Sequence, residues 1–224
     1  MDEIIVRVAR VLASYPRLRI LEYLAQHGET QPTALAEKLH VPLNTISAHL
    51  RALTTAGLIQ GRKSGPNCHY RLDSPYAGNT LSGKMSRWLL KVLGGPELRE
   101  DHRGLPEVRD DPPPELRPQL HEAIFEIATA FTDLRRLQIL RHLQTQGPAT
   151  PNELASELSM SKDAVSRHTI KLRRRGLIAP RGRDGRSATY ALCSDLKSPI
   201  HERMWEIVQA TWVERSSRTS GSPR

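Results

Sequence analysis

The sequence is poor in cysteine, in aromatic residues and in long apolar runs. Among its 224 residues, Phe, Trp and Tyr together make up 4%, and there are two cysteines. Cys68 and Cys193 are too few for a disulfide framework, so free thiols in a reducing compartment are the simplest interpretation. No apolar run reaches the ~18 residues of a membrane-spanning helix. The acidic start, MDE, is unlike a secretory signal.

The motifs of common enzymes are also missing from the sequence. It contains no phosphate-binding loop, no nucleophile elbow and no zinc-ligand spacing. We therefore expect no enzymatic activity, no cofactor and no metal.

Positive charge is abundant and unevenly distributed. The net charge is +9. Residues 1–94 hold 12 Lys and Arg against 6 Asp and Glu, and residues 118–224 hold 17 against 11, so each part carries +6. The segment 95–117 holds 4 against 7, a net of −3, and five prolines. Two basic parts joined by an acidic linker favour a polyanionic partner such as nucleic acid.

One segment of the chain occurs twice. Residues 17–59 align without a gap on residues 136–178, and 16 of the 43 positions are identical. A period this long indicates a duplicated domain, because solenoid repeats are much shorter. We predict a first copy at 1–94, a linker at 95–117, a second copy at 118–215 and a disordered tail at 216–224.

Each copy has the pattern of four helices, a hairpin and a last helix. Apolar residues recur at helical spacing up to Leu58-Ile59 and Leu177-Ile178, and the period then shortens toward two around glycine turns. Ser14 and Asp133 are expected to cap the second helix of their copies, and Thr150 with Glu153 forms a capping box. The first hairpin is one residue shorter, which pairs Tyr70 with Tyr190. The fold class is therefore mainly α with small β-hairpin wings, in two tandem winged helix-turn-helix domains.

The strings TISAHLRALTTAGLI and AVSRHTIKLRRRGLI, each followed by a basic hairpin, resemble the ArsR-type winged-helix transcriptional repressors of bacteria and archaea. The resemblance covers about four-fifths of the chain. It implies that the fourth helix of each copy enters the major groove and that the wing touches the neighbouring backbone. It also implies that the domains pair through their first and last helices. Pro42 and Thr169 depart from the residues usual at their positions, a capping Ser and a buried Leu.

The outward-facing positions of the fourth helices and the basic wing residues form the predicted DNA-binding set. Asn can pair with adenine, Arg or Lys can pair with guanine, and charged wing residues suit phosphate. The resemblance places His49 and His168 near the backbone, although a histidine that only packs against the turn is the alternative. The predicted residues are Asn44, Thr45, Ser47, Ala48, His49, Arg51, Arg62, Lys63, Lys162, Asp163, Ser166, Arg167, His168, Lys171, Arg181, Arg183 and Arg186. Arg173, Arg174 and Arg175 could serve only as a helix C-terminal cap.

Metal-sensing members of the resembled family carry ligand sets that are not found here. The nearest candidates, His121-Glu122 and His201-Glu202, are adjacent on a helix and point about 100° apart, so neither chelates alone. All three tryptophans, Trp88, Trp205 and Trp212, fall in the last helices, where they form either a buried seam or the wall of an effector pocket.

These observations predict a sequence-specific regulator of transcription that binds double-stranded DNA, most simply a repressor. Its two unequal fourth helices would read unequal half-sites, in an internal pseudo-dimer or in a homodimer of tandem chains. The alternatives are a tandem winged-helix scaffold that binds proteins, and a metal- or redox-responsive sensor that uses Cys68 and Cys193. The effector is not specified.

Overall fold

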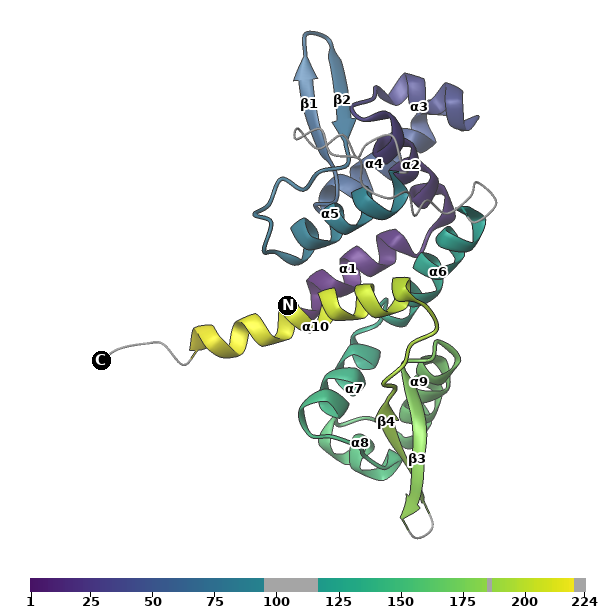
Figure 1. Cartoon of the computed structure of the whole chain (residues 1–224), viewed down its shortest axis with the longest axis vertical. Coiled ribbons are helices and arrows are strands. Elements are labelled where there is room, and N and C mark those ends of the chain that lie inside the picture. The colour runs from purple at the N-terminus through teal and green to yellow at the C-terminus, as the bar shows by residue number, and fades with distance from the viewer. Residues whose placement is uncertain (95–116, 185–186, 220–224) are drawn as a thin grey trace, which may run out of the picture. The chain divides into compact units, whose positions relative to one another are not determined.

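The computed structural model describes residues 1–94, 117–184 and 187–219. Almost all of the expected linker, together with residues 220–224 of the expected tail, lies outside the described residues. Within them the chain is mainly helical, with two short antiparallel hairpins (Figure 1). The predicted fold class, mainly α with small β-hairpin wings, is confirmed.

The same order of elements occurs in both copies. The first copy contains α1 (Asp2–Leu12), α2 (Tyr15–His27), α3 (Pro32–Leu39), α4 (Leu43–Thr55), β1 (Gln60–Ser64), β2 (Asn67–Arg71) and α5 (Leu81–Leu93). The second contains α6 (Arg117–Ala130), α7 (Leu134–Thr145), α8 (Pro151–Glu157), α9 (Lys162–Arg174), β3 (Ile178–Asp184), β4 (Ser187–Leu192) and α10 (Pro199–Thr219). Helix α10 therefore continues past residue 215, where we expected the last helix to end.

Two of the three expected helix caps form as predicted. The Asp133 carboxylate accepts hydrogen bonds from the amides of Arg135 and Arg136, at 2.9 and 3.2 Å. Thr150 and Glu153 make the reciprocal capping box. Ser14 precedes α2, but its hydroxyl caps no amide of that helix. One of the two amides that such a cap usually binds is missing, because the second helical residue is Pro16. The other, that of Arg17, donates to the Ser14 carbonyl at 3.1 Å.

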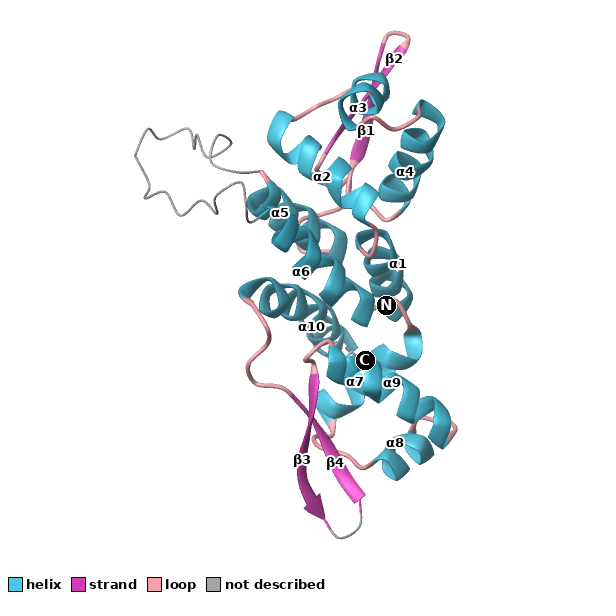
Figure 2. Ribbon diagram, turned by 90° about the vertical axis from the view of Figure 1, so that its right-hand side faces the viewer, coloured by secondary structure: helices cyan, strands magenta, loops and turns pink. Residues whose placement is uncertain are grey.

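The wings are two separate antiparallel hairpins, β1–β2 and β3–β4 (Figure 2). In the first, Arg62 pairs with His69 and Lys63 with Cys68. In the second, Arg181 pairs with Thr189 and Arg183 with Ala188, so one residue between the two arginines is unpaired. That residue is Gly182, with a φ of 65°. A bulge thus absorbs the extra residue of the second wing, and Arg62 and Lys63 correspond to Arg181 and Arg183.

Tyr70 and Tyr190 hold the two wings to the helical bodies in the same way. Tyr70 exchanges backbone hydrogen bonds with Thr30, and Tyr190 exchanges them with Ala149. The predicted correspondence of the two tyrosines is confirmed. Each bridge ties the returning wing strand to the residues just before the third helix of its copy.

Equivalent apolar positions form the core of each copy. Buried pairs related by the repeat are Leu18 and Leu137, Leu21 and Leu140, Leu35 and Leu154, Ile46 and Val165, and Leu53 and Leu172. The helical spacing that identified these residues in the sequence therefore gives the buried faces correctly.

The compact units of the structure do not follow the boundary between the copies. Unit 1 comprises Met1–Ala13 and Ala123–Glu206, and unit 2 comprises the described residues within Ser14–Glu122 and Ile207–Arg224. Unit 1 thus combines the helix-turn-helix and wing of the second copy with α1 of the first. Unit 2 combines the helix-turn-helix and wing of the first copy with the start of α6 and the end of α10.

Candidate nucleic-acid interface

Helix α4 presents a weakly charged outer face. Ile46, Leu50 and Leu53 are buried, which fixes the rotation of the helix. Of the predicted contact residues, Asn44, Ala48 and Arg51 are exposed, whereas Thr45, Ser47 and His49 are half-buried. The Asn44 amide oxygen accepts a hydrogen bond from the Thr45 amide at 2.8 Å. Leu43, which the sequence analysis did not select, is 45% exposed at the first position of this helix.

Helix α9 presents a strongly cationic outer face. Ser161 caps its start by accepting from the Ala164 amide at 3.2 Å, and Val165, Thr169 and Leu172 are buried. Thr169 satisfies its hydroxyl by donating to the Val165 carbonyl at 2.8 Å, which explains how a polar residue fits this buried position. The exposed side chains of this face are Lys162, Asp163, Ser166, Arg167, Lys171, Arg173 and Arg174.

The arginine run at the end of α9 divides into two kinds of residue. Arg173 and Arg174 are exposed, so they remain available to a partner. Arg175 is half-buried, and its guanidinium lies 3.5 Å from the Glu126 carboxylate of α6. Arg175 is thus held by the protein itself.

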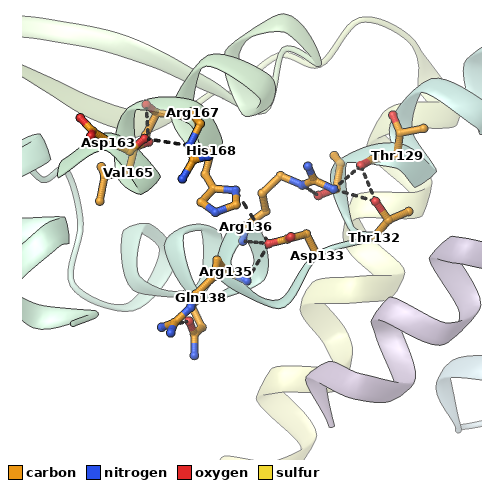
Figure 3. A network of polar contacts seen from close by, with 12 residues as sticks. Thr129, Thr132, Asp133, Arg135, Arg136, Gln138, Asp163, Val165, Arg167 and His168 are labelled. Carbon is orange, nitrogen blue, oxygen red and sulfur yellow. Dashed lines mark hydrogen bonds and ion pairs between the residues drawn. The ribbon is translucent and has the colours of Figure 1, made fainter. Parts of the chain in front are cut away.

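The two predicted histidines face inward. Burial lowers the pKa of both His49 and His168 below the ordinary value, with the positive charge of Arg17 acting in the same direction on His49. His168 Nδ1 lies 3.8 Å from the carboxylate of Asp133, which is the cap of α7 (Figure 3). At neutral pH both imidazoles are therefore neutral, which favours a positioning role over contact with phosphate.

Helix α9 rests against a polar cluster at the start of α7. Arg136 is 7% exposed and donates to the carbonyls of Ala130 and Thr129 and to the Thr132 hydroxyl (Figure 3). Burial on its own would raise the pKa of Asp133, but hydrogen bonds from the amide of Arg136 and nearby positive charge lower it below the ordinary value. The cluster joins α6, α7 and α9.

The wings differ in how free their basic side chains are. Lys63 and Arg181 are exposed. Arg62 makes a two-pronged hydrogen bond to Glu29, at 3.1 and 3.0 Å. The bond from Arg62 lowers the pKa of Glu29, so Glu29 is ionised at neutral pH and competes with phosphate for Arg62. The Arg183 side chain and the whole of Arg186 lie outside the described residues.

A notch of about 240 Å³ lies beside α4, lined also by residues of α3 and β2. It brings together two of the predicted residues, Ser47 and Arg51, with residues that sequence reasoning did not select. The lining residues are Pro32, Ser47, Leu50, Arg51, Thr54, Thr55 and Tyr70. Tyr70 lines the notch from strand β2 of the wing. Its place beside α4 depends on tertiary structure, so it cannot be predicted from the local sequence.

Possible ligands for a metal are dispersed. Within residues 1–94, 117–184 and 187–219, no group of three or more His, Cys, Asp and Glu is placed to hold an ion. His201 faces Ser198 at 2.9 Å and Glu126 at 3.6 Å. Cys68 and Cys193 are free thiols, and burial raises the pKa of Cys193. No helix in the described part of the chain is long and apolar enough to cross a membrane.

Two of the three tryptophans are buried. Trp88 and Trp205 are 8% and 7% exposed, and Trp205 stacks on Phe131 with ring centroids 5.9 Å apart. Trp212 is half-buried.

Comparison with known proteins matches both copies to helix-turn-helix families. Residues 12–62 match a helix-turn-helix domain, and residues 132–187 match the MarR family. The chain is 41% identical to the HTH-type transcriptional regulator Rv0324 of Mycobacterium tuberculosis over 68 residues, which are 30% of each chain. It is 25% identical over 210 residues to the phenylalanine–tRNA ligase alpha subunit of Methanopyrus kandleri, covering 88% of this chain and 40% of the ligase subunit.

A solved structure, HlyU from Vibrio cholerae, is 29% identical and covers 41% of this chain and 91% of its own, with a TM-score of 0.34. The chain thus spans less than half the length of the two sequence relatives described. Its fold and the matched domains define a winged helix-turn-helix protein, similar in sequence to transcriptional regulators.

Proposed function

We propose that the protein is a sequence-specific regulator of transcription that binds double-stranded DNA. The observation that carries the proposal is the outer face of α9, where Lys162, Arg167, Lys171, Arg173 and Arg174 are all exposed on the helix that follows the turn. Cations arranged in this way neutralise phosphates and pair with guanine edges in the major groove. The similarity to transcriptional regulators supports the same conclusion.

The finer proposal is a repressor of the ArsR type that acts as an internal pseudo-dimer at the nucleoid of a prokaryotic cell. Its first head, α4 with wing β1–β2, and its second head, α9 with wing β3–β4, would occupy two half-sites of one operator. Because their exposed residues differ, the half-sites would be unequal. Exposed Lys63 and Arg181 would contact the backbone beside each helix.

Binding to duplex DNA at a series of salt concentrations tests this function. With about 4–8 cation–phosphate contacts, the logarithm of the affinity should fall with the logarithm of salt concentration at a slope of roughly −4 to −7. A slope near zero, or no binding at low salt, would instead support a scaffold that binds proteins. Chelator treatment is a control, since we expect no metal requirement.

A further inference from the structure

Two ion pairs occupy equivalent places in the two copies. Extending the repeat toward the N-terminus makes Asp2 equivalent to His121, and it makes Glu22 equivalent to Arg141. Asp2 of α1 lies 3.0 Å from Arg141 of α7, inside unit 1. His121 of α6 lies 3.3 Å from Glu22 of α2, inside unit 2. The same pair of positions is thus used twice.

The extension of the repeat is supported by burial. Ile5 and Ile124 are 1% and 0% exposed, and Leu12 and Phe131 are both fully buried. These residues are related by the same offset as the ion-paired positions, so α1 and α6 turn the same faces inward.

In both units the first helix of one copy contacts the second helix of the other copy. This reciprocal pattern, in which position i meets position j and j meets i, is what two-fold pairing of like domains produces. Here both domains belong to one chain. The seam includes a further polar contact in unit 2, where the Tyr15 hydroxyl donates to the Glu122 carboxylate.

The charges at the repeated positions are reversed. The first copy has an acid at both, Asp2 and Glu22, and the second has a base at both, His121 and Arg141. Pairing of unlike copies joins acid to base at both places. Pairing of two first copies would place Asp2 against Glu22, and pairing of two second copies would place His121 against Arg141. Three of these side chains are mostly shielded, with exposures of 16% for Asp2, 11% for His121 and 18% for Glu22, whereas Arg141 is 46% exposed. Solvent therefore screens the repulsion between two first copies poorly, and it screens the repulsion between two second copies more.

We propose that these two ion pairs form a pairing code, in which the first copy selects the second copy of the same chain and rejects its own kind in another chain. The His121–Glu22 pair carries a charge on both partners only when the imidazole is protonated. Specificity of this kind comes from repulsion in the wrong partner as much as from attraction in the right one. The inference rests on the internal pairing proposed above, and it does not depend on DNA binding.

The double variant Glu22→Arg, Arg141→Glu tests the code in the full chain. Within one chain it sets like charges against each other at both places, and between chains it sets opposite charges against each other when like copies pair. We expect the wild type to have the mass of one chain, 25.2 kDa, and the double variant to shift toward twice that mass in light scattering. A wild type at twice the chain mass, or a folded double variant that stays at one chain mass, overturns the proposal.

Two matched variants separate charge from simple damage to the seam. Glu22→Gln, Arg141→Gln removes both attractions without creating new ones and should keep the mass of one chain. The fourfold variant Asp2→Arg, His121→Glu, Glu22→Arg, Arg141→Glu restores opposite charges within the chain with inverted polarity, and it should return to one chain mass.

Thermal unfolding provides a second measurement that remains informative if the double variant folds poorly. Arg141→Glu alone should lower the unfolding temperature by about 2–4 °C, the shift that a loss near 1 kcal/mol gives in a chain of this size. Adding Asp2→Arg should recover most of that loss. If neither this variant nor the fourfold variant shows recovery, the pairs do not select the partner. Because no arm of the experiment contains DNA, failure here is distinct from failure of the proposed DNA-binding function.

Discussion

The two recognition helices, α4 and α9, bury equivalent apolar residues, but their exposed faces differ in positive charge. Helix α4 carries one basic residue, Arg51, whereas α9 carries five basic residues and one acidic residue. The repeat places Ala48 opposite Arg167 and Leu43 opposite Lys162. The burial of equivalent apolar residues shows that the helices are turned alike. The difference therefore concerns what each head would bind, and in the proposed function the second head would supply most of the electrostatic attraction to DNA.

The first head is suited to a different kind of base recognition. Leu43 and Ala48 expose apolar groups, which suit the methyl group of thymine, and Asn44 suits adenine. Arg167 and Lys171 of the second head suit guanine. In the proposed function, the two copies would keep one fold and divide affinity and base preference between them.

The largest effect is expected from removing Arg167, the cation of α9 that stands where α4 has Ala48. Arg167→Ala should reduce discrimination between operator and unrelated DNA by about 1–3 kcal/mol if Arg167 contacts a base edge. Competition binding with labelled operator and random duplex measures this. Arg181→Ala in the wing is the control, since it should weaken all sequences about equally. Equal losses on both DNAs for Arg167→Ala would make Arg167 a phosphate contact.

The next largest effect concerns the residues that precede α7 and α2, the second helix of each copy. Asp133 caps α7 and faces His168, while its counterpart Ser14 caps no amide of α2. Asp133→Ala should lower the free energy of unfolding by about 0.5–2 kcal/mol, as measured by urea unfolding. The change Ser14→Asp should gain less than Asp133→Ala loses, because Pro16 removes one amide that a cap would bind. An equal and opposite effect of the two changes would refute this difference.

The sequence was sufficient to predict the features that depend on local pattern. Helix order, the buried faces, the Thr150 capping box and the correspondence of Tyr70 with Tyr190 all follow from periodicity and short-range patterns. The prediction failed locally at Ser14, where the proline two residues later outweighs the propensity of serine to cap a helix.

Features that depend on distant partners were not predictable in this way. Three of them join residues far apart in sequence: the ion pair of Glu29 with Arg62, the notch that includes Tyr70, and the placement of α1 in unit 1. Of the predicted DNA-binding set, all but Arg183 and Arg186 have described side chains, and their roles remain predictions.

A smaller effect is expected where the wings differ. Glu29→Gln should release Arg62 and raise affinity for all duplexes about two- to fivefold, because an exposed ion pair contributes little. Titration of labelled duplex measures the change. The gain should vanish in an Arg62→Ala background; a gain that persists there would come from the net charge alone.

The smallest effect is a dependence of stability on pH. Burial lowers the pKa of His49, His168 and His201 in the folded chain. Below about pH 6.5, the ordinary pKa of histidine, the unfolded chain therefore binds protons more readily, and the stability present at pH 7.5 should be lost as the pH falls. Urea unfolding at pH 7.5 and 5.5 measures this loss. His168→Gln should reduce the difference, and an unchanged difference would exclude His168 as a contributor.

Selection of bound sequences from a random DNA pool tests the central claim, that two unlike heads of one chain read DNA, most directly. The account predicts an asymmetric site, with one half rich in A and T for α4 and the other half containing guanine for α9. The Arg167→Ala variant should lose the preference only in the second half. Enrichment of a perfect palindrome, or of no sequence at all, would contradict the account.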